Sequence, residues 1–150
     1  MSHNTASDFG GGIYNEIGAT LTLNSSTVSN NTGLDGGGIT NDASTATVNS
    51  SKIVGNVATN KGGGITNDNG GTFTVASSTV SGNTAPDGGG IFNIDPNTPL
   101  MLKGSAVEQN TASDMRLGSG GGVLIYPGSG PFTNKGSSIS GNTPDDCDGC

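Results

Sequence analysis

Two rows of acidic residues recur along the chain at similar intervals. The first row comes shortly before successive runs of glycine and consists of Asp8, Asp35, Asp87 and Asp114. The second row comes shortly after such runs and consists of Glu16, Asp42, Asp68 and Asp95. If equivalent residues stack in layers ~4.8 Å apart, the carboxylates of the first row are candidate ligands for Ca²⁺, which takes several oxygen ligands. Lys61 interrupts that row, and Asp is also common in hydrated turns, so a structural role stays open.

Threonines form a second pattern with chemical potential. Pairs separated by one residue recur in three segments, as Thr20, Thr22, Thr45, Thr47, Thr72 and Thr74. Because alternate residues of a strand share one face, these threonines predict two parallel files on an outward surface. A flat array of this kind resembles the ice-binding faces of some β-solenoid antifreeze proteins. Since Thr also favours solvent-facing strand positions, a structural reading remains open.

The residues that catalysis would need are poorly placed. His3 is the only histidine and lies at the start of the sequence, so a Ser–His–Asp triad is unsupported. Glycosidases need two carboxylates ~5–9 Å apart in one cleft, whereas these acids occupy repeated corners. Cys147 and Cys150 have the spacing of half a zinc site, but no second pair completes four ligands. We therefore expect a disulfide there, or pairing with a downstream cysteine, and no enzymatic activity or cofactor other than the Ca²⁺ alternative.

The composition limits the elements that can position these residues. Of 150 residues, 28 are Gly, 11% are charged and 29% are hydrophobic. Gly, Ser, Thr and Asn at this density disfavour helices, whereas recurring Thr, Val and Ile favour strands. The net charge of −7 argues against nucleic acid as a partner, because such binding needs clustered Lys and Arg. No apolar run reaches the ~18 residues of a membrane-spanning helix, so we expect no direct membrane insertion by this segment.

Internal repeats set the fold. Gly-Gly-Gly-Ile recurs every 26 residues with its last residue at Ile13, Ile39, Ile65 and Ile91, and a variant ending at Val123 follows after 32. A second motif places an aliphatic residue three positions before Asn, as Val28/Asn31, Ile53/Asn56, Val80/Asn83, Val107/Asn110 and Ile139/Asn142. Short alternating segments such as residues 20–23, 45–48 and 72–75 lie between the two motifs.

Each repeat of about 26 residues thus predicts three short strands, and stacked repeats predict an all-β, parallel β-helix of about five coils. Three stacks of aliphatic side chains should fill its interior: Ile13/Ile39/Ile65/Ile91/Val123, Leu23/Val48/Val75/Leu102 and Val28/Ile53/Val80/Val107/Ile139. The repeated Asn side chains should hydrogen-bond along a ladder of identical neighbours. A further file, Tyr14, Thr40, Thr66, Phe92 and Leu124, should point outward.

The two motifs carry a family resemblance. Gly-Gly-(small)-(Ile/Leu/Val) followed by Phe-x-x-Asn is the repeat pair of polymorphic outer-membrane proteins, and this chain is similar, with Gly as the small residue and Val or Ile in place of Phe. It also resembles the repeats of large bacterial and archaeal surface proteins, at residues 10–15 and 78–85. The resemblance implies a right-handed parallel β-helix that is extracellular or displayed on the cell surface.

These observations lead to a functional expectation. Residues 1–150 should form one β-helix domain that is a segment of a longer surface protein, with an irregular insertion near residues 114–120. The expected function is that of a non-enzymatic structural stalk or adhesin-like surface. Ice binding by the threonine files and polysaccharide binding or processing are the alternatives. Expected partners are a second copy bound end to end through open strand edges, and a host surface, glycan or ice.

Overall fold

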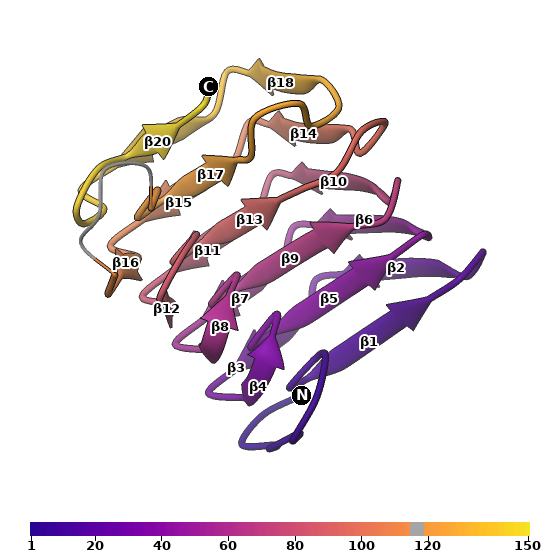
Figure 1. Ribbon diagram of the computed structural model, residues 1–150. Helices are drawn as coiled ribbons and strands as arrows, with labels where there is room; N and C mark the ends of the chain where they lie inside the picture. The colour runs from indigo at the N-terminus through magenta and orange to yellow at the C-terminus, as the bar shows by residue number, and fades with distance from the viewer. Residues whose placement is uncertain (115–118) are drawn as a thin grey trace.

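The computed structural model describes residues 1–114 and 119–150, and within these ranges strands are the only regular secondary structure (Figure 1). Every strand pairing is parallel and joins a strand to its equivalent in the next coil. The chain therefore winds upward through about five coils, with its two termini at opposite ends of the stack (Figure 1). The predicted all-β, parallel β-helix is confirmed.

Four sheets surround the interior of the described chain, and each is a column of equivalent strands. The first sheet, which faces the viewer in Figure 1, contains β1 (Ile13–Glu16), β5 (Ile39–Asp42), β9 (Ile65–Asp68), β13 (Ile91–Asn93), β17 (Val123–Ile125) and β20 (Cys147–Asp148). The second sheet contains β2 (Thr20–Asn24), β6 (Thr45–Asn49), β10 (Thr72–Ala76), β14 (Leu100–Lys103) and β18 (Phe132–Lys135). The third contains β3 (Thr27–Ser29), β7 (Lys52–Val54), β11 (Thr79–Ser81), β15 (Ala106–Glu108) and β19 (Ser138–Ser140). The fourth contains β4 (Thr32–Asp35), β8 (Val57–Lys61), β12 (Thr84–Ala85) and β16 (Thr111–Ala112).

The fourth sheet gives the coils one strand more than the three that the sequence predicts. Its inward positions carry only very small residues, which are buried: Gly33, Ala58, Ala85 and Ala112. The prediction relied on alternating large aliphatic residues, and this segment has none that face the core. The fourth sheet therefore contributes no large aliphatic side chain to the core.

The predicted interior stacks all form. Ile39, Ile65 and Ile91 are in register and fully buried in the first sheet. The stacks of the second and third sheets are also in register along their predicted members. A fourth stack in the second sheet includes Phe73 and Leu100, which are also buried. The core is therefore a set of single files that run parallel to the axis.

Polar ladders run beside these files. In the predicted ladder, each buried Asn donates its amide to the next, as Asn56 Nδ2 does to Asn83 Oδ1 at 3.0 Å. A second buried ladder, which is not among the sequence predictions, links Asn41 and Asn67 in the first sheet at 2.8 Å. Each ladder satisfies buried amides with one another, which removes the usual cost of burying them.

The Gly-Gly-Gly motif forms the corner before the first sheet. The first glycine of a run takes a left-handed backbone, with φ +65° at Gly62. A Cβ atom on the second, Gly63, would overlap the backbone of Thr84 and Gly89 in the next coil. Successive coils thus approach more closely at this corner than any side chain permits.

Two further observations concern the irregular segment expected near residues 114–120 and the question of a membrane-spanning helix. Residues 115–118, which form most of the insertion expected near residues 114–120, lie outside the described residues. Within the described ranges, no helix is long and apolar enough to cross a membrane.

Candidate functional site

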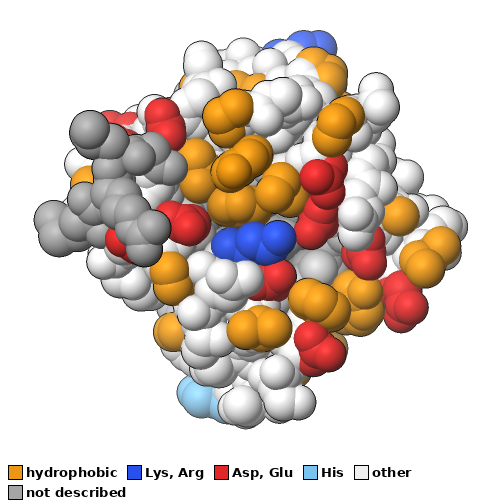
Figure 2. All heavy atoms as spheres, viewed as in Figure 1, with side chains coloured by type: hydrophobic (Ala, Val, Ile, Leu, Met, Phe, Trp, Pro, Cys, Tyr) orange, Lys and Arg blue, Asp and Glu red, His pale blue; other side chains and the backbone are white. Residues whose placement is uncertain are grey.

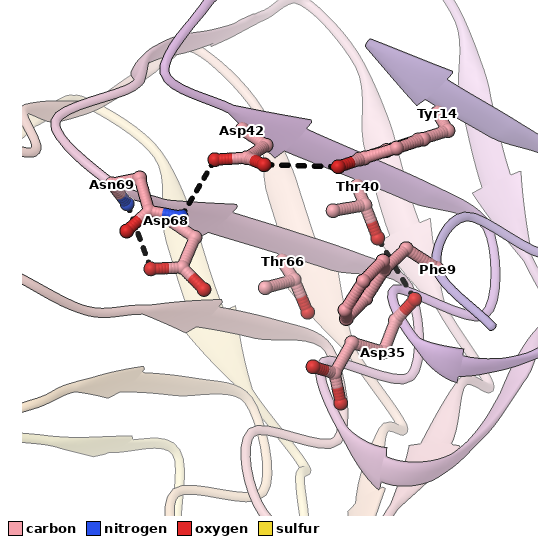
Figure 3. A pocket seen from close by; sticks show the side chains of 8 residues that line it. All are labelled: Phe9, Tyr14, Asp35, Thr40, Asp42, Thr66, Asp68 and Asn69. Carbon is pink, nitrogen blue, oxygen red and sulfur yellow. Dashed lines mark hydrogen bonds between the residues drawn. The ribbon is translucent and has the colours of Figure 1, made fainter. Parts of the chain in front are cut away.

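A small cavity lies on the outer face of the first sheet (Figure 3). There β1, β5 and β9 pass beside the corner segment that precedes each of them, at residues 8–12, 35–38 and 61–64. Its volume is about 40 Å³, and it is lined by Phe9, Tyr14, Asp35, Thr40, Asp42, Thr66, Asp68 and Asn69. On the same face, acidic side chains gather around hydrophobic ones (Figure 2). A wider depression near β17 and the C-terminal residues is lined mainly by the turn at residues 126–130, and among the described residues no acidic or basic side chain lines it.

Two threonine hydroxyls hold the corner segment over the sheet. Thr40 Oγ1 donates to the carbonyl oxygen of Asp35 at 2.8 Å and accepts from the Gly10 amide at 3.0 Å. One coil further, Thr66 Oγ1 donates to the carbonyl oxygen of Lys61 at 3.2 Å. These bonds explain why both threonines are buried although their side chains point away from the core.

This arrangement corrects the expectation of an outward, exposed file. Tyr14, Thr40, Thr66, Phe92 and Leu124 are in register as predicted. Only Tyr14 is exposed, because the corner segment covers the others. The sequence does not predict this burial. The residues that cover the file are small or polar ones at the end of the fourth-sheet strands and in the glycine runs that follow them.

An exposed aromatic pair forms one wall of the cavity. The rings of Phe9 and Tyr14 lie 5.7 Å apart between centroids, and both residues are about 40% exposed. Tyr14 donates its hydroxyl proton to Asp42 Oδ2 at 2.9 Å, and Asn69 Nδ2 donates to Asp42 Oδ1 at 2.7 Å (Figure 3). Desolvation, together with the hydrogen bond and charge of Asp42, raises the pKa of Tyr14 to about 12. The phenol is therefore a protonated donor at any physiological pH.

The turn after β9 supplies the opposite wall. Asn69 and Gly70 both have positive φ, and the Gly71 amide donates to the carbonyl oxygen of Asp68 at 2.8 Å, which closes the turn. The Asn69 amide then donates to Asp68 Oδ1 at 2.7 Å and to Asp95 Oδ2 at 3.3 Å. Burial and a hydrogen bond to Asp95 raise the pKa of Asp68, while the same bond lowers the pKa of Asp95. The two carboxylates thus share one environment, and Asp68 is the one that takes up a proton first.

Lys61 is the cation beside these acids. Its Nζ lies 3.8 Å from Asp35 Oδ2, 3.5 Å from Asp68 Oδ2 and 5.2 Å from the centre of the Phe92 ring. Asn60 Nδ2 donates to Asp35 Oδ1 at 2.7 Å. Lys61 is thereby held between two carboxylates and an aromatic face, and the cavity keeps an excess of negative charge.

The structure separates the predicted acidic rows. In the first row, Asp35 pairs in register with Lys61, and Lys61 forms a backbone β-bridge with Asp87. A cation therefore stands at the centre of this row. Asp8 and Asp114 lie at the equivalent corner in other coils. In the second row, Glu16, Asp42 and Asp68 follow one another in register. Among the described residues, no group of three or more acidic, His or Cys side chains is placed to hold a metal ion.

The threonine files lie on the second sheet, away from the cavity. Thr20, Thr45 and Thr72 are in register, as are Thr22, Thr47 and Thr74. The next strand places Met101 beside Thr74, so the array is three coils deep. All six side chains are exposed or half-buried.

The two cysteines lie at the far end of the stack. Cys147 and Cys150 are joined in a disulfide, and Cys147 belongs to β20, which adds a strand beside β17.

Comparison with known proteins finds no matching family model, no matching curated protein and no matching solved structure.

Proposed function

We propose that this chain is a non-enzymatic, extracellular β-helix segment that serves as a stalk with an adhesin-like surface, and that it binds glycans at the cavity beside Tyr14. One observation carries the proposal: the exposed Phe9–Tyr14 pair adjoins a hydrogen-bonded set of carboxylate, amide and phenol groups. Sugar rings present an apolar face that stacks on aromatic rings and hydroxyls that bond to such polar groups.

The rest of the molecule supports a role as a rigid support. Continuous Asn ladders and aliphatic files tie each coil to the next along the axis. The site draws on Tyr14, Thr40 and Thr66 in three successive coils, so its geometry depends on their stacking. The disulfide between Cys147 and Cys150 is consistent with an oxidising compartment, as is the resemblance to surface-protein repeats.

Titration with short neutral β-linked oligosaccharides, followed by calorimetry, tests glycan binding. We expect measurable binding by the parent chain and a loss of at least tenfold in affinity on Tyr14→Ala, because the stacking surface is removed. Leu34→Ala is the control, since Leu34 is similarly exposed but lines neither the cavity nor the wider depression. Equal affinities for the parent and Tyr14→Ala would refute the proposed site.

Ice binding is the second candidate, favoured by the two threonine files in register on the second sheet. Thermal-hysteresis and ice-shaping measurements separate it from glycan binding. Replacing Thr47 at the centre of the array with a bulky residue should abolish ice shaping if that surface is functional. The same substitution should leave oligosaccharide binding unchanged.

A further inference from the structure

The cavity has room for one small polar group and not for a whole sugar. Its volume of about 40 Å³ exceeds the ~10–15 Å³ that a single water molecule needs. The rings of Phe9 and Tyr14 line its exposed side, and Thr40 and Thr66 lie deeper in the same cavity (Figure 3). A sugar stacked on the exposed ring of Tyr14 can therefore insert one substituent.

The hydrogen-bonding groups that line the cavity favour a ligand group that donates hydrogen bonds. The hydroxyl protons of Thr40 and Thr66 are already used by backbone carbonyls, and the phenol proton of Tyr14 is used by Asp42. Asp42 also accepts from Asn69 Nδ2, and Asp68 accepts from the Asn69 backbone amide and from Lys61 Nζ. Both carboxylates keep lone pairs after these bonds, because each carboxylate has about four acceptor sites. Acceptors thus outnumber free donors around the cavity.

The charge of the lining selects a cation. Three carboxylates line the cavity, those of Asp35, Asp42 and Asp68, and none of the basic residues that the structure describes lines it. Lys61 neutralises part of this charge from the side of Asp35 and Asp68. The lining therefore remains negative, while the two aromatic rings add a second attraction for a cation.

We propose that this cavity binds the protonated amino group of an amino sugar, so that the glycan held at Tyr14 is one with free, unacetylated amino groups. This inference rests on the proposed glycan-binding function and names its ligand class. The ammonium donates to the carboxylate oxygens of Asp42 and Asp68 and lies beside the Phe9 ring. The carbon face of the same sugar then stacks on Tyr14.

Other substituents fit this lining less well. A uronate or sulfate would place a further anion against three carboxylates, which is repulsive at these short distances. An N-acetyl group carries no positive charge, so it gains neither the charge-assisted hydrogen bonds nor the cation–π attraction of an ammonium. A free hydroxyl fits by size but gains no charge-assisted hydrogen bond.

Calorimetric titration of the full chain with three β-1,4-linked oligosaccharides of equal length, made of glucosamine, N-acetylglucosamine or glucose, tests the inference. We expect glucosamine oligomers to bind at least tenfold more tightly than either of the others. Asp68→Asn should weaken glucosamine binding about five- to tenfold and change glucose binding less than about twofold. Glu108→Gln is the matched control, because it removes one exposed carboxylate from β15 of the third sheet, and we expect it to change neither affinity.

The outcomes distinguish this inference from the function on which it rests. Equal affinities for the three oligosaccharides, with loss of all binding on Tyr14→Ala, would overturn the amino-sugar assignment and leave glycan binding intact. Equal weakening by Asp68→Asn and Glu108→Gln would show that only overall charge matters, which also overturns it. If no oligosaccharide binds, both proposals fall. Thermal unfolding of each variant checks that it is folded under the conditions of the titration.

Discussion

The substitution Asn83→Ala tests whether the buried Asn ladder stabilises the fold. Asn83 is fully buried at the middle of the ladder. Its side chain makes four hydrogen bonds: Oδ1 accepts from the Asn56 amide at 2.9 Å and from Asn56 Nδ2 at 3.0 Å, and Nδ2 donates to the carbonyl of Ile53 at 3.0 Å and to Asn110 Oδ1 at 2.9 Å. Alanine removes all four bonds and leaves their buried partners one hydrogen bond short.

The magnitude follows from these four bonds. A buried hydrogen bond contributes about 1 kcal/mol net, and a buried group left unpaired costs more. Asn56 Nδ2 and Asn110 Oδ1 each keep one other partner, which limits the loss. We therefore expect Asn83→Ala to lower the free energy of unfolding by about 3–5 kcal/mol.

Urea-induced unfolding followed by circular dichroism measures this change. The matched control is Asn24→Ala, because Asn24 is exposed and its side chain accepts one bond, from Asn49 Nδ2 at 3.2 Å. The control should change the free energy of unfolding by less than about 0.5 kcal/mol. A change below about 1 kcal/mol for Asn83→Ala would refute the view that the ladder is a major source of stability.

The substitution Asn83→Asp tests the ladder in a second way, through the pH dependence of the free energy of unfolding. The new carboxylate would face the oxygen acceptors of Ile53 and Asn110, so burial and repulsion should raise its pKa in the folded state. A raised folded-state pKa means that stability is fully present below the ordinary Asp value of ~3.9 and is lost as pH rises through the folded value. We therefore expect this variant to be closest to the parent in acid and to weaken toward neutral pH.

Three further predictions address the core, an unpaired hydroxyl and the site. Ile65→Ala should lower the free energy of unfolding by about 2–4 kcal/mol through lost burial and a cavity, and melting within a degree or two of the parent would contradict the inward register. Ser44 has the one buried side-chain oxygen that lacks a hydrogen-bond partner among the described residues. Ser44→Ala should therefore raise the free energy of unfolding in urea by up to about 1 kcal/mol. A marked decrease in that free energy would show that the hydroxyl is hydrogen-bonded. Tyr14 should ionise at a pH near 12 by ultraviolet absorbance, with stability falling between pH ~10 and that value because the unfolded chain releases its proton first. Asp42→Asn should shift this midpoint downward, and an unchanged midpoint would show that desolvation alone sets it.

Much of the architecture is predictable because the same residue types recur in each coil and stack on one another. Ile39, Ile65 and Ile91 recur at one period, and stacking places each on its neighbour in register. The alternation of side chains along a strand then decides which of them face inward. Asn83 is predictable for the same reason, since an amide stacked on an identical amide both donates to one neighbour and accepts from the other.

The candidate site was only partly predictable. Sequence patterns place Tyr14 in the outward file and Asp42 and Asp68 together in the second acidic row, but they do not connect the phenol with the two carboxylates. Phe9 and Asn69 are not predicted as site residues, although the Asn69–Gly70 pair is typical of a tight turn. That turn places the Asn69 backbone amide within hydrogen-bonding distance of Asp68, the preceding residue, and of Asp95 in the next coil.

The sequence by itself therefore determined the coil period and the inward files, because each depends on local alternation or on the stacking of identical residues. Only the tertiary structure decided that a fourth sheet closes the coil and that Thr40 and Thr66 lie under the corner segment. Small inward residues such as Ala58 carry no alternating signal, and the direction in which a corner folds depends on backbone angles and on contacts with the next coil. The cavity beside Tyr14 exists because that corner folds back over the first sheet and leaves a gap between three coils.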